Sequence, residues 1–347
     1  MDLATLDALE DSPMHAWQIS SFGVDSLEFV ERPTPQPGPG EVLVRVHAIS
    51  INYRDLLMVK GFYNPKLKLP RIPCSDGAGE ISAVGEGVTR WKPGDRVAGT
   101  FMQNWLDGPL TPAKAKGALG GDIDGMLAEY VVLRETGLVR LPAHLSFEEA
   151  ATLPCAAVTA WNALAAGNLK PGSTVLTLGT GGVSIFALQL ARLMGVRVLG
   201  ISGSAAKLER ARSLGLDAAL NYRESPNWDR WALDQTGGEG VDLVVEVGGV
   251  GTLPRSLGAI RMGGVIAQIG VLTGPADPLP LPLILHKQVR IQGIYVGSRK
   301  DFEQMNKAIS LAALRPVIEC FPWSEAHEVM ARMEAASHFG KLVLTVE

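Results

Sequence analysis

The sequence has few cysteines, and those it has are not spaced as ligands or as a disulfide framework. Cys74, Cys155 and Cys320 are far apart, odd in number and without any C-x-x-C pair. Such usage is typical of proteins in a reducing compartment. We therefore expect a cytoplasmic protein.

The sequence also lacks an excess of positive charge and long apolar segments. Its 32 Lys and Arg residues are dispersed and are outnumbered by 36 Asp and Glu, which leaves a net charge of −4. A nucleic-acid backbone would need a basic field, so nucleic acid is not expected as a main partner. Residues 1–12 are acidic, without the basic and apolar pattern of an export signal, and no uncharged apolar run reaches about 18 residues. These absences argue against export and against membrane insertion.

Two patterns divide the 347 residues. The first 135 are rich in short strands and turns, with Val42, Val44 and Val46 alternating along one strand. From Ser146, helical segments alternate with short apolar strands, which predicts an α/β fold with a doubly wound parallel sheet. The strands expected there are 173–178, 196–201, 217–220, 241–246, 265–270 and 289–296, followed by helical residues 301–335 and a last strand over 341–346.

A glycine loop lies at the centre of this second pattern. The sequence from Ser173 to Ser202 predicts strand, loop, helix and strand, and the loop contains Gly179, Thr180, Gly181, Gly182 and Val183. Glycines at such a turn let the backbone approach a pyrophosphate at a helix N-terminus, so we expect a dinucleotide here. The third glycine of the usual G-x-G-x-x-G pattern is replaced by Ser184. The alternative is a buried turn that needs glycine only for packing.

The residues after the second strand bear on the choice of cofactor. Ser202 ends that strand where an acidic residue would hold the ribose 2′-OH of NAD, and Ser204, Lys207 and Arg210 follow. Hydroxyls and cations suit a 2′-phosphate, so NADP(H) is favoured over NAD(H). The alternative is an ordinary helix start, with Ser204 as N-cap and both cations in solvent.

Several motifs, taken in order, resemble the medium-chain dehydrogenase/reductase superfamily, in particular its zinc-independent, quinone-oxidoreductase-like branch. They are the stretches 38–45, 52–55, 77–80, 92–97 and 125–130, together with the glycine loop. The resemblance implies a GroES-like catalytic domain over residues 1–156 and 296–347 and a Rossmann nucleotide-binding domain over 157–295. It also implies a homodimer in which the last strand of the nucleotide-binding sheet pairs with its symmetry mate.

The resemblance extends to zinc enzymes, whose ligands are mostly missing here. Those enzymes have a cysteine at Asn52 or its neighbour, Gly-His-Glu at residues 74–76, and a cysteine that matches Cys155. Only Cys155 remains, no histidine lies beside these motifs, and the cysteines of a structural zinc lobe are absent. We therefore expect no metal, because a catalytic zinc needs about three protein ligands. Two alternatives stay open: a residual site of Cys155 with Asp76 or Asp55, and Cys155 as a small buried hydrophobe.

Without zinc, hydrogen bonds have to polarise the acceptor. The resemblance implies that Asn52, Tyr53 and Asp55 line the substrate cleft beside the nicotinamide. Tyr53 can then donate a proton and Asn52 can bind the developing oxyanion. The alternative is structural, with Tyr53 packed as a half-buried aromatic and residues 52–55 capping the helix expected over 56–60.

The resemblance also assigns cofactor contacts further along the chain. It implies that Thr159 lies near the nicotinamide ribose and ring, and that Asn221 and Tyr222 contact the adenosine end. Residues that follow later strands complete the expected set: Val247, Gly248, Gly270, Val271, Gly297 and Ser298.

Together these features predict a cytoplasmic NADPH-dependent oxidoreductase that transfers hydride to a small-molecule quinone, activated alkene or carbonyl without zinc. One alternative is a zinc-type alcohol dehydrogenase. The other, from a different class, is a dinucleotide-binding sensor protein without catalytic activity, because a fold does not fix a function.

Overall fold

The computed structural model describes residues 13–274 and 279–346. The chain divides into two compact units, which we call unit 1 (Met1–Cys155 and Gly297–Glu347) and unit 2 (Ala156–Val296). The residues on which the absence of an export signal was judged, 1–12, lie outside the described part. No helix within that part is long and apolar enough to cross a membrane.

Unit 1 is built on strands, as its sequence predicts. An antiparallel hairpin joins β1 (Pro13–Ile19) to β2 (Leu27–Pro33). A seven-stranded sheet follows, in which β6 (Tyr130–Arg134) pairs with β3. Its other strands lie in the order β14 (Ile318–Pro322), β15 (Lys341–Thr345), β3 (Glu41–Ile51), β4 (Asp76–Val84), β5 (Arg96–Gly99) and β7 (Leu138–Arg140). The helices of this unit are α2 (Tyr53–Val59), α3 (Phe147–Ala150), α10 (Arg299–Leu311) and α11 (Ala326–Glu334).

The prediction of uninterrupted helical structure over 301–335 was wrong. Strand β14 lies between α10 and α11 and pairs in parallel with β15. Its side chains are only partly buried, so it carries neither the apolar run of a central strand nor a clear alternation. Pairing with the buried strand β15, far along the sequence, outweighs this weak local pattern.

The pairing of β15 with β3 brings the end of the chain to the start of α2. Leu342 pairs with Ile51 in the antiparallel register, so Lys341 comes opposite Asn52. Gly340 precedes it with φ of +75°, and a Cβ there would lie 2.4 Å from the carbonyl oxygen of Val317. Only glycine allows this turn, and the turn places Lys341 at the start of β15, between β14 and β3.

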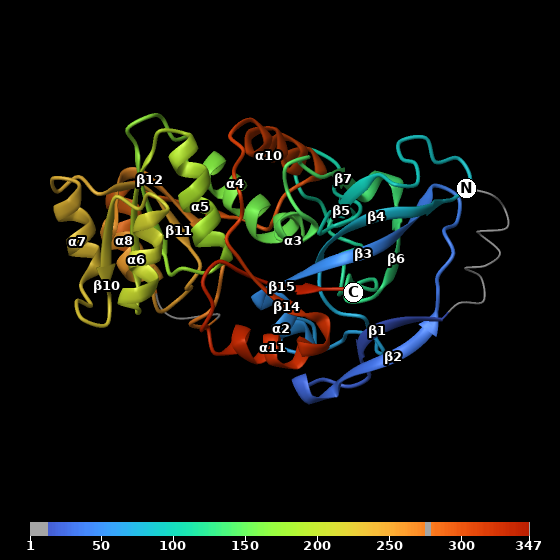
Figure 1. Cartoon of the computed structure of the whole chain (residues 1–347). Helices are drawn as coiled ribbons and strands as arrows, with labels where there is room; N and C mark the ends of the chain where they lie inside the picture. Colours follow the sequence, from blue (N-terminus) through green and yellow to red (C-terminus); the bar gives the residue numbers. More distant parts are fainter. Residues whose placement is uncertain (1–12, 275–278, 347) are drawn as a thin grey trace. The chain divides into compact units, whose positions relative to one another are not determined.

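Unit 2 is the predicted doubly wound parallel sheet (Figure 1). Its six strands lie in the order β10 (Ala218–Asn221), β9 (Arg197–Ser202), β8 (Thr174–Leu178), β11 (Val241–Glu246), β12 (Ile260–Gln268) and β13 (Arg290–Gly293). Its helices are α4 (Val158–Ala166), α5 (Gly182–Leu193), α6 (Ala205–Ser213), α7 (Trp228–Gln235), α8 (Leu253–Ala259) and α9 (Leu281–Lys287). Strand order reverses beside β8, the position at which open α/β sheets bind ligands.

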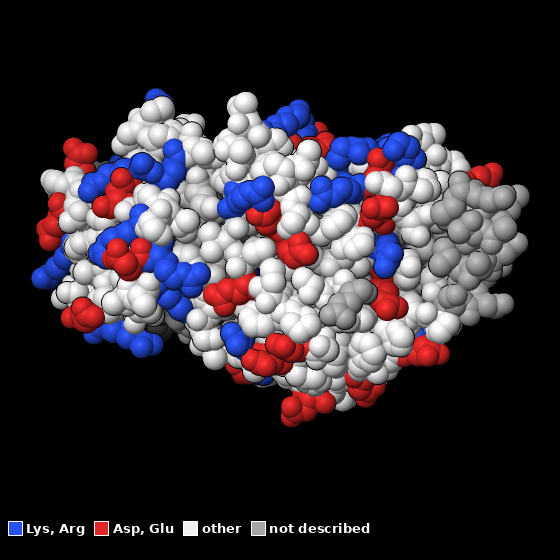
Figure 2. All heavy atoms as spheres, in the orientation of Figure 1, with Lys and Arg blue, Asp and Glu red and all other residues white. Residues whose placement is uncertain are grey.

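The surface of the molecule carries charges of both signs. On the face shown in Figure 2, the basic and acidic side chains of the described residues are interspersed and form no broad field of one sign. This distribution agrees with the small net charge of the sequence.

Candidate functional site

The glycine loop of unit 2 has the backbone geometry that a pyrophosphate needs. Gly179 has φ of +75°, and a Cβ there would meet no atom within 4 Å. Gly181 is the N-cap of α5 in an extended conformation, and no side chain caps the helix. The first N–H groups of α5 are thus available to an anion, and the helix dipole favours negative charge at this end.

Ser184, at the third position of the glycine pattern, has a structural role. Its side chain is buried, and its hydroxyl donates a 2.6 Å hydrogen bond to the carbonyl oxygen of Leu178. This bond ties the first turn of α5 to the end of β8. Serine therefore replaces glycine without disturbing the contact between helix and strand.

A buried carboxylate that the sequence analysis did not single out organises the next strand ends. Glu246 is fully buried at the end of β11, and its Oε1 accepts hydrogen bonds from the backbone of Gly248 and Gly249 and from the hydroxyl of Thr252. Gly270 packs directly against the backbone of Val247, because a Cβ on Gly270 would lie 2.0 Å from the carbonyl oxygen of Val247. Val247, Gly248, Gly270 and Val271 are thus brought together, as predicted, beyond adjacent strands. The sequence feature that could have identified Glu246 is a glutamate at the end of the apolar strand β11.

At the end of β9, hydroxyl and guanidinium groups gather. Ser202 is buried, and a Cβ on Gly203 would lie 2.9 Å from the Tyr222 hydroxyl oxygen and 2.8 Å from Nε of Arg223. Tyr222 and Arg223 therefore flank a strand end without a carboxylate, which suits an anionic group, and Lys207 lies in the first turn of the helix that follows. Arg223 was missed by the sequence analysis.

Other expected residues of this region have local roles. The backbone N–H of Lys207 donates to the Ser204 hydroxyl, so Ser204 caps α6 as the alternative interpretation required. The side-chain amide of Asn221 donates to Glu224. Thr159 is buried in the first turn of α4.

Gly297 and Ser298 belong to unit 1 and not to the strand ends of unit 2. Ser298 is the N-cap of α10, and its hydroxyl and backbone N–H both donate to the Asp301 carboxylate. The backbone N–H of Asp301 returns a bond to the Ser298 hydroxyl. This capping box accounts for Ser298 in the structure.

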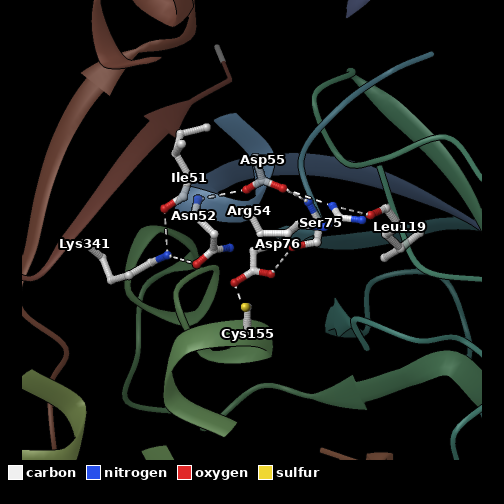
Figure 3. A network of polar contacts seen from close by, with 9 residues as sticks. All are labelled: Ile51, Asn52, Arg54, Asp55, Ser75, Asp76, Leu119, Cys155 and Lys341. Carbon is white, nitrogen blue, oxygen red and sulfur yellow. Dashed lines mark hydrogen bonds and ion pairs between the residues drawn. The ribbon is translucent and has the colours of Figure 1, made fainter. Parts of the chain in front are cut away.

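In unit 1, the segment 52–55 starts α2 and leads into a buried polar network (Figure 3). One carboxylate oxygen of Asp55 accepts from the backbone N–H of Asn52 at 2.8 Å. The other accepts from Arg54 and from the backbone N–H of Ser75, each at 3.1 Å. The capping alternative is therefore present, and both oxygens of Asp55 are engaged: two bonds come from the α2 segment itself, and the bond from Ser75 joins this segment to the residue that precedes β4. We assign Asp55 a positioning role.

Asp76 is the second buried carboxylate of the network. It accepts hydrogen bonds from the Ser75 hydroxyl at 2.7 Å and from the backbone N–H of Cys155 at 3.0 Å. Burial raises the pKa of Asp76 to about 6, with a smaller raising effect from Asp55, while the Lys341 ammonium opposes the shift. Protonated and ionised forms of Asp76 therefore exchange near neutral pH.

Lys341 is the buried cation opposite these carboxylates, and the sequence analysis did not identify it. Its side chain is 3% exposed, and its ammonium donates to the carbonyl oxygen of Ile51 at 2.8 Å and to the side-chain oxygen of Asn52. Figure 3 shows the ammonium and the amide facing each other across the end of β3. Its only sequence signal was a charged residue at the start of an apolar strand.

The side chains at the positions of the zinc ligands do not fit zinc. Burial raises the pKa of the Cys155 thiol, which disfavours the thiolate that zinc needs, and the Asn52 oxygen is taken by Lys341. Both oxygens of Asp55 already accept hydrogen bonds, which leaves Asp76 and Cys155, fewer than the three ligands of a catalytic site. Within residues 13–274 and 279–346, no group of three or more His, Cys, Asp or Glu side chains could hold a metal ion.

Tyr53, the expected proton donor, is the first residue of α2 and is 37% exposed. It lies next to Asn52, the N-cap of that helix. Its side chain is thus open to a ligand, while the network positions the backbone on which it stands.

Comparisons with known proteins agree with both units. A family model described as the alcohol dehydrogenase GroES-like domain matches residues 38–143, and one described as zinc-binding dehydrogenase matches residues 182–311. A zinc-type alcohol dehydrogenase-like protein of Schizosaccharomyces pombe is 44% identical, over 94% of this chain and 96% of its own length. Acryloyl-coenzyme A reductase of Metallosphaera sedula is 33% identical, over 82% and 85%.

Solved structures with the same architecture differ in the cofactor that their names give. An NAD-dependent alcohol dehydrogenase superposes with a TM-score of 0.89 at 35% identity, over 96% of this chain and 100% of its own. A 2-octenoyl-CoA carboxylase reductase, in complex with NADP and 2-octenoyl-CoA, has a TM-score of 0.88 at 26% identity, over 99% and 90%. A GroES-like unit, a Rossmann unit and relatives of this identity place the chain in the medium-chain dehydrogenase/reductase superfamily of oxidoreductases.

Proposed function

We propose that this protein transfers hydride from NADPH to an activated alkene, quinone or carbonyl without a catalytic metal. The observation that carries the proposal is the buried pair of Lys341 and Asn52, which puts an ammonium and an amide beside Asp76 and Cys155 where zinc enzymes have metal ligands. Two similar proteins support this choice of acceptor by their names: one is an acryloyl-coenzyme A reductase, and the other is a 2-octenoyl-CoA carboxylase reductase in complex with NADP and 2-octenoyl-CoA.

The residues of the chain have separate tasks in this reaction. The loop Gly179–Gly182 and the start of α5 would hold the pyrophosphate of the cofactor, and its nicotinamide would supply the hydride. Asn52 donates a hydrogen bond to the acceptor oxygen as negative charge develops on it. Tyr53 gives up its hydroxyl proton to the reduced product, and solvent returns it.

Turnover and metal content test this proposal together. Purified protein is assayed with NADPH and a panel of quinones, enones, enoyl thioesters and aldehydes, before and after treatment with a chelator, and its zinc is measured by elemental analysis. We expect turnover of at least one acceptor class, well below one zinc per chain, and no loss on chelation. Stoichiometric zinc whose removal abolishes turnover would instead favour a zinc-dependent alcohol dehydrogenase; one relative is named a zinc-type alcohol dehydrogenase-like protein and another an alcohol dehydrogenase. Cofactor binding without any turnover would favour a sensor protein.

We also propose that NADPH is preferred over NADH. Ser202 puts no carboxylate at the end of β9, Tyr222 and Arg223 flank that end, and Lys207 lies in the first turn of α6 just after it. A 2′-phosphate would meet cations and hydroxyls.

A homodimer through β13 is the proposed assembly. This strand is the edge of the parallel sheet, and all four of its residues are exposed. An exposed edge strand can add a second copy of itself. Light scattering at micromolar concentration should give twice the mass of the chain, and a monomer would contradict the proposal.

A further inference from the structure

The side-chain amide of Asn52 is buried but only half satisfied. Its oxygen accepts a hydrogen bond from Lys341, whereas its Nδ2 has no hydrogen-bond partner among the described residues, although the side chain is 7% exposed. The carboxylate of Asp76 lies on the same side, and the amide helps to lower the pKa of Asp76 without meeting hydrogen-bond geometry. A buried donor without a partner is destabilising, so its presence calls for a partner that binds there.

Lys341 determines which end of this amide is the orphan. An amide can turn over and exchange its oxygen and nitrogen, and only the surrounding hydrogen bonds decide between the two orientations. An ammonium has three donors and no acceptor, so the atom of Asn52 that faces Lys341 has to be oxygen. Nδ2 is then the atom left for a ligand.

The backbone holds Lys341 firmly in this role. The register of β15 with β3 sets it opposite Asn52, and Gly340 makes the turn that precedes it. A second bond, to the carbonyl oxygen of Ile51, fixes the ammonium at the same strand end.

Charge in the network favours an acceptor oxygen that becomes negative. Lys341 and Arg54 face Asp55 and Asp76, so the network is close to neutral when both carboxylates are ionised and gains a positive charge when Asp76 is protonated. A developing oxyanion beside Nδ2 would thus meet an N–H donor backed by an ammonium on the far side of the amide.

On the basis of the proposed function, we propose that Lys341 is a positioning residue that locks the Asn52 amide with Nδ2 toward the substrate, and that the substrate is an alkene conjugated to a carbonyl, a quinone or a carbonyl compound whose oxygen accepts this bond. Lys341 itself does not touch the substrate. Its effect passes through the orientation and polarisation of Asn52.

Four variants test this on whichever acceptor the unmodified enzyme reduces. Lys341→Met removes the ammonium and keeps the buried chain, Asn52→Asp keeps the bond to Lys341 but presents oxygen in place of N–H, and the third variant combines both. Lys287→Met is the matched control, because the Lys287 ammonium is likewise bound by oxygen acceptors, in its case three backbone carbonyl oxygens of unit 2. Each variant is measured for kcat, KM, NADPH affinity and thermal unfolding.

We expect kcat to fall about 10²-fold in Lys341→Met and in Asn52→Asp, with NADPH affinity unchanged, because one oxyanion donor typically contributes that much. The double variant should be within about threefold of the worse single one, since both changes remove one interaction. Lys287→Met should lower thermal stability but leave kcat as it is. Multiplicative losses in the double variant would overturn the positioning role, as would an unchanged kcat in Lys341→Met.

Failure of this inference is distinguishable from failure of the proposed function. If the unmodified enzyme reduces none of the acceptors, the function itself is wrong. If it turns over and the variants do not follow the pattern, only the role of Lys341 is wrong. Should Lys341→Met not fold, Asn52→Asp decides alone, and an unchanged kcat in that variant overturns the proposal.

Discussion

The two units form their candidate sites from different parts of the chain. In unit 2, backbone N–H groups of the glycine loop and turns at strand ends make most of the site, and the nearby cations are at the surface. In unit 1, the site is a network of buried side chains that come from residues 52–55, 75–76, 155 and 341. A backbone site needs only space and a free helix end, whereas a side-chain site has to balance its charges before it can bind anything.

The largest effect should come from placing charge in the backbone site. Gly181→Asp puts a carboxylate at the N-cap of α5, where it occupies the free N–H groups and repels a pyrophosphate. The loss of two charge-assisted bonds, at about 1.5–3 kcal/mol each, should weaken NADPH binding by roughly 10²–10⁴-fold. Fluorescence titration measures this.

Gly181→Ala is the matched control, because its extended backbone accepts any residue and alanine adds no charge. Its affinity should stay much closer to that of the unmodified protein. If both variants lose the same NADPH affinity, the size of the side chain at residue 181, and not its charge, determines binding at this loop.

Replacement of Asp76 tests the side-chain site through its pH dependence. Because the folded state raises the pKa from 3.8 to about 6, ionisation of Asp76 costs stability above pH 6, and this cost disappears as the pH falls below 4. The free energy of unfolding of Asp76→Asn, relative to the unmodified protein, should therefore rise by about 3 kcal/mol between pH 4 and pH 8. Urea unfolding at both pH values measures it.

Asp95 is the control, because its pKa is shifted in the opposite direction from that of Asp76. A hydrogen bond from Arg140 holds the pKa of this carboxyl below its usual range, so its stabilising effect is present above pH 3.8 and is lost in acid. Asp95→Asn should therefore lower the free energy of unfolding at neutral pH, and this difference from the unmodified protein should disappear only in acid, below pH 3.8. If the stability difference between Asp76→Asn and the unmodified protein does not change with pH, the pKa of Asp76 is not raised in the folded state.

Tyr53 tests whether an exposed side chain takes part in the chemistry of the buried site. Tyr53→Phe keeps the ring and removes the hydroxyl, so kcat should fall about 10²-fold while NADPH affinity stays the same. A rise in KM alone would assign the hydroxyl to substrate orientation. An unaltered kcat/KM would mean that solvent, and not Tyr53, donates the proton.

The smallest effect concerns the cations at the end of β9. Lys207→Ala should weaken NADPH binding by about 10-fold and hardly change NADH binding, because one charge-assisted contact with the 2′-phosphate is lost. Arg212→Ala, on the same helix but paired with Glu209 at the surface, is the control and should affect neither cofactor. Equal affinity of the unmodified protein for both cofactors would contradict the proposed preference.

The fold and the backbone site could be predicted because their signals are local. Glycines, apolar strands and helix caps lie within about 30 consecutive residues around the loop Gly179–Gly182, and each has a physical reason that holds without knowledge of the rest. The departure at Ser184 became intelligible only when its bond to Leu178 was visible. The region after α10 shows where local signals fail. Its strand β14 forms because it pairs with β15, which is distant in the sequence, and not because of its own residue pattern.

The side-chain site could be predicted only in part because its members meet through the sheet and not through the sequence. Asn52 and Asp55 were identified from a motif, and their capping geometry followed from spacing. Lys341 lies 289 residues from Asn52 and meets it only through the register of β15 with β3. No local pattern distinguishes such a lysine from a solvated one at a strand end.

The three cysteines have a practical consequence for labelling. Cys74 is buried and Cys155 is partly buried, and desolvation raises the pKa of both thiols, which keeps them in the unreactive protonated form. Cys320 is exposed on β14, with a pKa raised by partial burial and by the carboxylates of Glu148 and Glu149. A maleimide fluorophore or spin label should therefore attach at Cys320 alone, faster in mildly alkaline buffer, without any cysteine first being removed.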